Sequence, residues 1–96
     1  LELRCGQIIK AERIPKSDKL LCLEVDLGAQ TRQIVSGIAK AYEPQALQGK
    51  KVIVLCNLAP AKLRGVQSDG MILAGGEELP QVIFLDDAMP LGTRIR

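Results

Sequence analysis

One polar stretch in the second half of the chain carries the side chains best suited to chemistry. Lys62 and Arg64 lie two residues apart, and Asn57, Gln67 and Ser68 lie close to them in sequence. Cations bind phosphate oxygens, while amide and hydroxyl groups bind phosphates, ribose hydroxyls or base edges. The pattern therefore indicates a binding site for a nucleic-acid backbone.

Residues suited to catalysis or metal binding are scarce. The chain has no His, so the usual general base at neutral pH is missing, and no glycine-rich phosphate-loop motif occurs. The cysteines Cys5, Cys22 and Cys56 are isolated, which favours small buried side chains in a reducing compartment over a zinc site. We expect no catalytic residue, no metal and no cofactor.

Charge is unevenly distributed along the sequence. Residues 1–64 hold 11 basic and 6 acidic side chains, whereas residues 65–96 hold 2 basic and 5 acidic ones. No basic residue lies between Arg64 and Arg94. We expect a polyanion to bind one side of the molecule and to avoid the other.

Aromatic residues are almost absent, and this restricts the kind of nucleic acid. Tyr42 and Phe84 are the only two. Domains that hold single strands stack the bases on aromatic rings, and two rings hardly make such a platform. The composition therefore favours recognition of folded RNA by its shape and backbone.

These side chains must be positioned by short strands, because Gly and Pro recur between short apolar runs. We predict strands over residues 3–14, 20–27, 31–36, 52–56, 71–74 and 82–85, and a last short strand ending at Ile95. One or two helical turns are expected within residues 38–47, and a polar loop over residues 57–70. In the first strand, alternation places Ile8 and Lys10 on one face and Ile9 on the other, while Gly6 allows a bend.

Three strands, a short helix and two more strands is the order of an all-β, five-stranded OB-fold barrel. By periodicity alone, an SH3-like barrel or a small sandwich is also consistent with the pattern. We expect a single domain, residues 1–96, with a barrel over about 1–75 and a C-terminal β extension over about 76–96. No stretch approaches the ~20 apolar residues of a membrane span. The chain begins with Leu1 rather than Met, and we expect it to be a piece of a longer protein.

Several sequence blocks together resemble a known family. They are Val25-Asp26-Leu27-Gly28, residues 32–39 (RQIVSGIA), Tyr42 with Pro44, residues 47–52 (LQGKKV) and, above all, residues 57–71 (NLAPAKLRGVQSDGM). In this order and spacing they resemble the EMAP-II-like tRNA-binding domain, in the form found at the C-terminus of bacterial methionyl-tRNA synthetases. One departure is Ile14 before Pro15, where that family usually has His.

The resemblance implies an OB-fold that binds tRNA without sequence specificity in the cytoplasm, beside a synthetase catalytic core in cis or in trans. It implies an RNA-contacting set of Arg32, Asn57, Lys62, Arg64, Ser68 and Met71, although a Met that opens a strand is more often a packing residue. It also implies a homodimer formed largely through the extension.

The apolar run Val82, Ile83, Phe84 and Leu85 is the predicted dimer interface, with an ordinary core strand as the alternative. A domain whose main task is protein interaction is the second functional hypothesis. A secretion-type chaperone on the same scaffold is the third, and it is less similar over residues 32–39.

Overall fold

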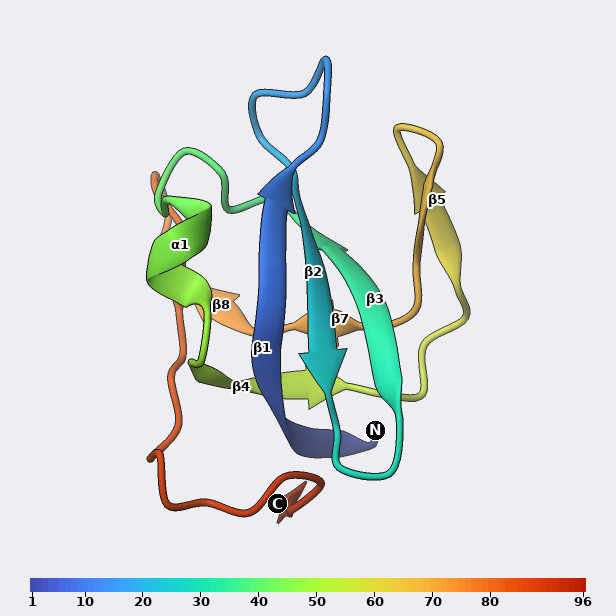
Figure 1. Ribbon diagram of the computed structural model, residues 1–96, viewed down its shortest axis with the longest axis vertical. Coiled ribbons are helices and arrows are strands. Elements are labelled where there is room, and N and C mark those ends of the chain that lie inside the picture. The colour runs from blue at the N-terminus through green and yellow to red at the C-terminus, as the bar shows by residue number, and fades with distance from the viewer.

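Five strands curve into a nearly closed antiparallel barrel (Figure 1). The computed structural model describes residues 1–96. The strand order is β3-β2-β1-β4-β7, with β1 Leu3–Arg13, β2 Leu21–Asp26, β3 Thr31–Ser36, β4 Lys51–Leu55 and β7 Met71–Ile72. The short helix α1, Pro44–Leu47, lies between β3 and β4. The predicted OB-fold barrel with its helix is therefore confirmed.

Four shorter pairings complete the fold. β5 Ala61–Leu63 pairs with β6 Val66–Ser68, and β8 Ala74–Gly75 pairs with β9 Gln81–Val82. β10 Arg94–Ile95 pairs with the start of β1, and Phe84 forms an isolated bridge with Val52. No helix of the structure has the length and apolar character needed to cross a membrane.

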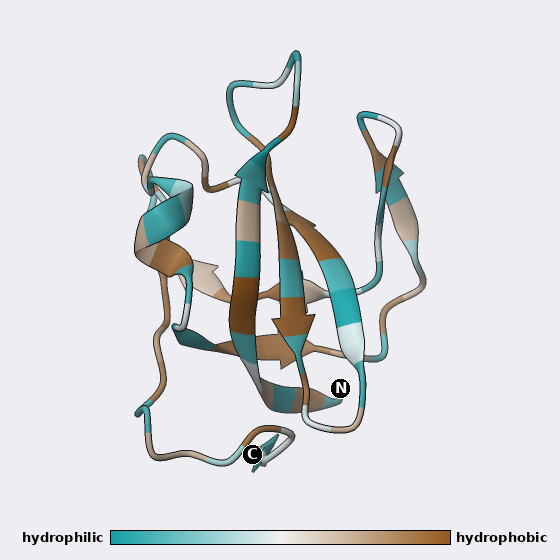
Figure 2. Ribbon diagram, in the orientation of Figure 1, coloured by the Kyte–Doolittle hydropathy of each residue, from teal (hydrophilic) through white to brown (hydrophobic).

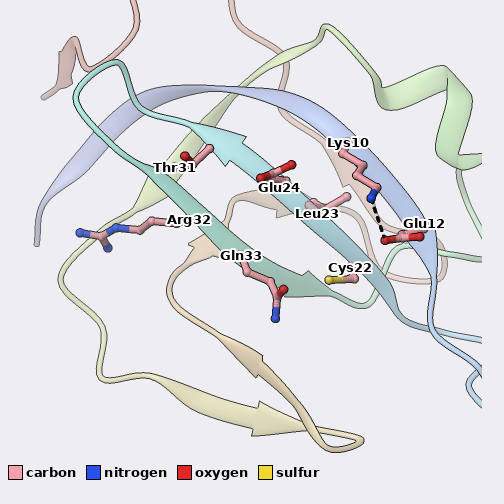
Figure 3. A pocket seen from close by; sticks show the side chains of 8 residues that line it. All are labelled: Lys10, Glu12, Cys22, Leu23, Glu24, Thr31, Arg32 and Gln33. Carbon is pink, nitrogen blue, oxygen red and sulfur yellow. Dashed lines mark ion pairs between the residues drawn. The ribbon is translucent and has the colours of Figure 1, made fainter.

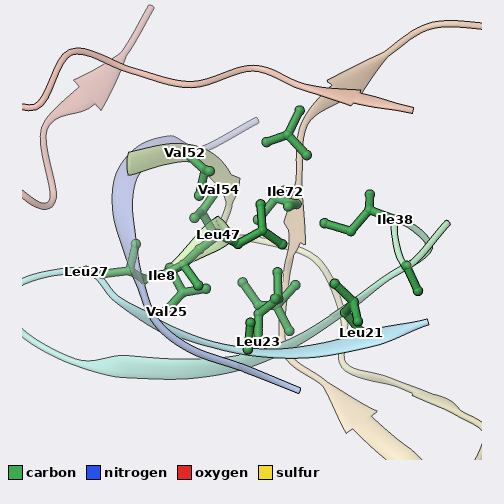
Figure 4. Close-up of a cluster of buried hydrophobic side chains, with 14 of the residues drawn as sticks. Ile8, Leu21, Leu23, Val25, Leu27, Ile38, Leu47, Val52, Val54 and Ile72 are labelled. Carbon is green, nitrogen blue, oxygen red and sulfur yellow. The ribbon is translucent and has the colours of Figure 1, made fainter. Parts of the chain in front are cut away.

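The core is aliphatic, as the composition predicts (Figure 4). Fifteen buried residues form one cluster, and Tyr42 packs against it. In β4, all four residues from Val52 to Leu55 are buried, so this strand is covered on both faces.

A bulge in β1 makes one sequence prediction wrong. The register against β2 shifts between Ile8 and Lys10, so Ile8 is fully buried whereas Lys10 is exposed and Ala11 returns to the core. Ile9 is 46% exposed. The extra residue of a bulge interrupts the two-residue period, and strict alternation could not anticipate this.

Three other predicted elements differ from the structure. The stretch 57–70 is not only a loop, because it contains the β5–β6 hairpin. The strand predicted over 71–74 is divided into β7 and β8, since Leu73 lies between two different pairings. The run 82–85 is not one strand: the ladder with β8 ends at Val82, and Phe84 makes only its single bridge.

Candidate nucleic-acid interface

The β5–β6 hairpin carries the two cations at the centre of the predicted site. Leu63 pairs with Val66, so Arg64 and Gly65 form a two-residue turn. Both have positive φ, 52° and 78°, which is the backbone of a type I′ turn. Lys62 and Arg64 are exposed and have no acidic partner within 4.0 Å. The hairpin thus presents two unpaired positive charges to solvent.

The base of this hairpin is bonded to the open edge of β3. The side-chain amide of Gln33 donates to the carbonyl oxygen of Gln67 at 2.8 Å, and the Asp69 N–H donates to the Gln33 carbonyl at 2.8 Å. The buried Val35 N–H donates to the Ser68 hydroxyl at 2.9 Å. These bonds close the barrel where β3 has no backbone ladder with a neighbour, and they fix the position of the hairpin.

Arg32, one of the predicted contacts, is largely engaged within the protein. Its side chain is 16% exposed, and its Nη1 donates to the Cys56 carbonyl at 2.5 Å. Its Nε lies 3.9 Å from an Asp69 carboxylate oxygen and has no hydrogen-bond partner. The pKa of the Cys56 thiol is raised, mainly because the thiol is buried.

The other predicted contacts differ in accessibility. Asn57 is exposed, and its Oδ1 accepts a hydrogen bond from the Glu2 N–H at 2.9 Å. Ser68 is 5% exposed, and its hydroxyl also donates to the Gly70 carbonyl at 3.1 Å. Met71 is 44% exposed at the start of β7, so it is not the packing residue that the alternative expected.

A shallow hollow of about 330 Å³ lies on the outer face of β1, β2 and β3 (Figure 3). In Figure 3, Arg32 stands at one side of it, and the ion pair between Lys10 and Glu12, 3.6 Å, stands at the other. Glu24 and the partly exposed Cys22 also line the hollow. Its two carboxylates and two cations leave this strand face without a basic surplus.

The β1–β2 turn is a second basic loop, and its Lys16 and Lys19 lie outside the RNA-contacting set that the resemblance implies. The Ser17 N–H donates to the Ile14 carbonyl at 3.1 Å, and Lys16 has φ 67°. Pro followed by a residue with positive φ is the arrangement of a type II turn. Lys16 and Lys19 are exposed and form no ion pair. In the sequence, this turn is marked by Pro15 and the charged run Lys16-Ser17-Asp18-Lys19 that follows it.

A barrel with a basic hairpin and a basic turn fits a binding domain. The family described as "Putative tRNA binding domain" matches residues 3–94. The chain belongs to this family. The tRNA-binding domain is a non-catalytic binding module, and the resemblance noted from the sequence blocks is confirmed.

The relatives of this tRNA-binding domain are mostly larger proteins. It is 56% identical over 96 residues to the methionine–tRNA ligase of Methanoregula boonei, covering 100% of this chain and 14% of the ligase. The chain therefore spans about one seventh of that relative, and most of the ligase has no counterpart in it.

Two solved structures are similar over nearly their whole length. A protein related to methionyl-tRNA synthetase from Pyrococcus horikoshii has a TM-score of 0.95 and 38% identity, covering 99% of this chain and 89% of that chain. The chaperone CsaA from Bacillus anthracis has a TM-score of 0.84 and 32% identity, covering 100% of this chain and 90% of that one.

Proposed function

We propose that this domain binds the body of folded tRNA through its sugar-phosphate backbone and does so without catalysing a reaction. The observation that carries the proposal is the β5–β6 hairpin, which holds Lys62 and Arg64 unpaired in solvent while its base is bonded to β3. A charged loop fixed on a rigid scaffold binds with little loss of conformational entropy.

The predicted contact residues take different parts in this proposal. Lys62 and Arg64 bind phosphates, and the exposed Asn57 and Met71 are accessible for further contacts. Arg32 offers RNA only the donors not already used on the Cys56 carbonyl. Ser68 acts through the fold, because its hydroxyl already accepts one hydrogen bond and donates another inside the protein.

Recognition by shape rather than by base stacking is supported by the two aromatic residues. Tyr42 and Phe84 pack edge to face, with ring centroids 5.9 Å apart, and the Tyr42 hydroxyl accepts a hydrogen bond from the Val82 N–H. Neither ring is a lining residue of the strand-face hollow. A single strand therefore finds no stacking surface there.

The salt dependence of binding tests this function. With about four phosphate contacts, the slope of log affinity against log salt is expected to be on the order of −3. The measurement is filter binding of a tRNA preparation over a salt series, with oligo-dT as the single-stranded comparison. A flat salt response, or equal affinity for oligo-dT, contradicts the proposal.

We further propose that the domain serves a methionyl-tRNA synthetase core in the cytoplasm, in cis or in trans. Its similarity to a seventh of a methionine–tRNA ligase supports this role. Adding the chain in trans to a ligase core that lacks the matched region is expected to lower the KM for tRNA and to leave kcat nearly unchanged. An unchanged KM contradicts the role.

A homodimer is the second part of the proposal, and we assign it to the extension, residues 76–96, that follows the barrel. Ile83 and Phe84 are 45% and 42% exposed, and Leu85 is half-buried beside them. Val82 belongs to the core cluster, so we expect this side chain to hold the extension against the barrel. Light scattering at micromolar concentration is expected to give a dimer, and I83S/F84S a monomer.

A chaperone function is the second candidate, supported by the structural similarity to CsaA. The apolar side chains Leu58, Leu63 and Met71 are each at least 40% exposed on and around the hairpin. If this candidate function is right, the domain is expected to suppress the aggregation of an unfolded client protein. The variant L58S/L63S is expected to lose this effect. No suppression at any ratio of domain to client contradicts it.

A further inference from the structure

We propose that the end of the barrel at which the chain termini lie holds a second phosphate-binding site, formed by Arg4 and Arg94 beside Arg32. The Glu2 carboxylate lies among these guanidinium groups and competes with the phosphate for them. This inference rests on the proposed tRNA-binding function and extends the RNA contact beyond the hairpin.

Three arginines from different strands surround one carboxylate at this end. Arg4 Nε donates to Glu2 Oε1 at 2.9 Å, and Arg94 lies directly opposite Arg4 in the ladder between β1 and β10. The pKa of Glu2 is lowered, first by the hydrogen bond and the charge of Arg4, and then by the charges of Arg32 and Arg94. All three guanidinium groups therefore act on the same carboxylate.

The positive charges at this end exceed the negative ones. Arg4 has Glu2 as its partner, and Arg32 has Asp69 at 3.9 Å. Arg94 is exposed and has no acidic partner within 4.0 Å. Like charges directly opposite each other destabilise an antiparallel pair of strands. The Arg4–Arg94 pair therefore favours the binding of a further anion.

The count of charges along the sequence does not reveal this site. Arg94 belongs to the acidic part of the chain, residues 65–96, whereas Arg4 belongs to the basic part. The pairing of β10 with the start of β1 brings the two arginines together. Figure 2 shows hydrophilic residues on both strands near the chain termini. Charges that are segregated in the sequence are thus brought together at this end of the molecule.

A hollow of about 390 Å³ gives an anion access to Arg4. It is lined by Glu2, Cys56 and the turn between β2 and β3, residues 28–30, among others. Arg4 Nη1 donates to the Gly92 carbonyl at 2.9 Å, which together with the bond to Glu2 fixes the guanidinium. Its Nη2 is left for a ligand, and a planar guanidinium suits the oxygen atoms of a phosphate.

The site is connected to the hairpin through the edge of β3. Arg32 Nη1 donates to the Cys56 carbonyl, and residues 57–61 lead from Cys56 to Lys62 in the hairpin. Figure 1 shows the hairpin and the N-terminus on the same side of the molecule, next to β3, toward opposite ends of the long axis. This axis measures 34 Å, so one folded RNA that follows the edge can contact both sites.

Glu2 allows a test in which binding becomes stronger. Its N–H donates to Asn57 Oδ1 at 2.9 Å, and its carbonyl accepts a hydrogen bond from the Cys56 N–H at 2.8 Å. Glu2→Gln keeps both backbone bonds and removes the competing negative charge. We expect this variant to bind tRNA about threefold more tightly, because a carboxylate repels phosphate.

The matched control for Glu2→Gln is Glu78→Gln. Glu78 is exposed between β8 and β9 and forms no ion pair. Its substitution removes the same charge away from the three arginines, and we expect it to change the affinity much less.

Arg94→Gln removes the cation that has no acidic partner. We expect about fivefold weaker tRNA binding at physiological salt and a salt slope shallower by about 0.7 to 0.9. The Tm is expected to be no lower than that of the wild type, since a pair of like charges is lost. Lys50→Gln removes the same charge at a residue over the Phe84 ring and is expected to keep the wild-type slope.

Inorganic phosphate is the second probe, because it separates a free anion from the RNA backbone. In an NMR titration we expect phosphate to shift the Cys56 and Gly92 amides of the wild type, and to shift them much less in Arg94→Gln. If phosphate shifts these amides while Arg94→Gln keeps the wild-type salt slope for tRNA, the site binds free phosphate and its assignment to RNA is wrong.

The other outcomes separate this inference from the proposed function. If Arg94→Gln keeps the wild-type slope while K62A/R64A loses affinity, the domain binds tRNA without this site, and only the inference is wrong. If Glu2→Gln binds tRNA no more tightly than Glu78→Gln, the carboxylate does not compete with RNA, and the inference is again wrong. If the wild type binds no tRNA, both proposals fall.

Discussion

The Ser68 hydroxyl lies 2.9 Å from the backbone nitrogen of Val35 and accepts its hydrogen bond. Ser68 is the only polar residue among the 22 buried ones. On the edge away from β2, β3 has no ladder partner, and there the hydroxyl takes the place that a carbonyl oxygen occupies elsewhere in the barrel. The same hydroxyl donates to the Gly70 carbonyl, so one side chain closes the barrel and fixes the chain between β6 and β7.

Ser68→Ala is therefore expected to lower the free energy of unfolding. The variant leaves the buried Val35 N–H without an acceptor, which costs about 1–3 kcal/mol, and each kcal/mol lowers the Tm of a domain this size by roughly 4–8 °C. Calorimetry measures the change. Ser36→Ala, at the partly exposed end of β3, is the control and is expected to have a Tm near that of the wild type.

Arg64→Asn is expected to separate stability from RNA binding. Asn-Gly is the preferred pair in a type I′ turn, so the variant relieves the positive φ of Arg64 and raises the free energy of unfolding by a fraction of a kcal/mol up to about 1 kcal/mol. It also removes one phosphate contact, so the salt slope for tRNA becomes shallower by about 0.7 to 0.9. Lower stability together with unchanged affinity contradicts both the turn assignment and the contact.

The strands were predictable wherever a side-chain period of two decided which face is buried. In β2, buried Leu21, Leu23 and Val25 alternate with more exposed residues, so the burial of apolar surface determines the register. The bulge after Ile8 was not predictable, because one inserted residue leaves no trace in composition.

The candidate site was predictable in residue type but not in role. Lys62 and Ser68 lie in the same sequence block, yet one is exposed and the other buried. The difference depends on Val35, which is 33 positions from Ser68 and needs a hydrogen-bond acceptor at the closing edge of the barrel. Only the tertiary structure brings that donor to the hydroxyl. The positive φ of Lys16 likewise could not be predicted from the charge pattern of the sequence.

Gly6→Ala is expected to destabilise the domain, because core side chains pack closely against β1 at this residue. A Cβ atom at Gly6 lies 2.6 Å from Val25 Cγ1 and 2.9 Å from Val54 Cγ2, both in the core. Overpacking of this kind costs about 1–3 kcal/mol, which urea denaturation measures. Gly37→Ala is the control, since nothing lies within 4 Å of the added methyl group. Equal midpoints for the two variants contradict the packing argument.

The thiols are expected to react slowly and in a definite order. Burial raises the pKa of Cys5, Cys22 and Cys56, so the thiolate fraction at neutral pH is below that of a free cysteine. Cys22 is partly exposed on the strand face, whereas the other two are buried. Alkylation followed by mass spectrometry is expected to modify Cys22 first, at a rate that still rises above about pH 8.5. A rate that levels off below that pH contradicts the raised pKa.

Lys51→Met is expected to loosen the extension from the barrel. The Lys51 ammonium donates to the Asp87 and Met89 carbonyls, both at 2.6 Å, while the Leu85 N–H donates to the Lys51 carbonyl at 2.8 Å. Met keeps most of the apolar stem but cannot donate, so the loss is about 1–3 kcal/mol. Because both acceptors are in the extension, we expect faster hydrogen exchange at the Met89 and Gly92 amides and little change at the β2 amides.

The matched control for Lys51→Met is Lys50→Met, which removes the same charge one residue away. Lys50 lies over the Phe84 ring and donates no hydrogen bond to the extension. If the proposed dimer forms through the extension, Lys51→Met also raises the dimer dissociation constant, and Lys50→Met changes it less. Equal exchange rates at Met89 in the two variants contradict the anchoring role, because only Lys51 bonds the carbonyls of that turn.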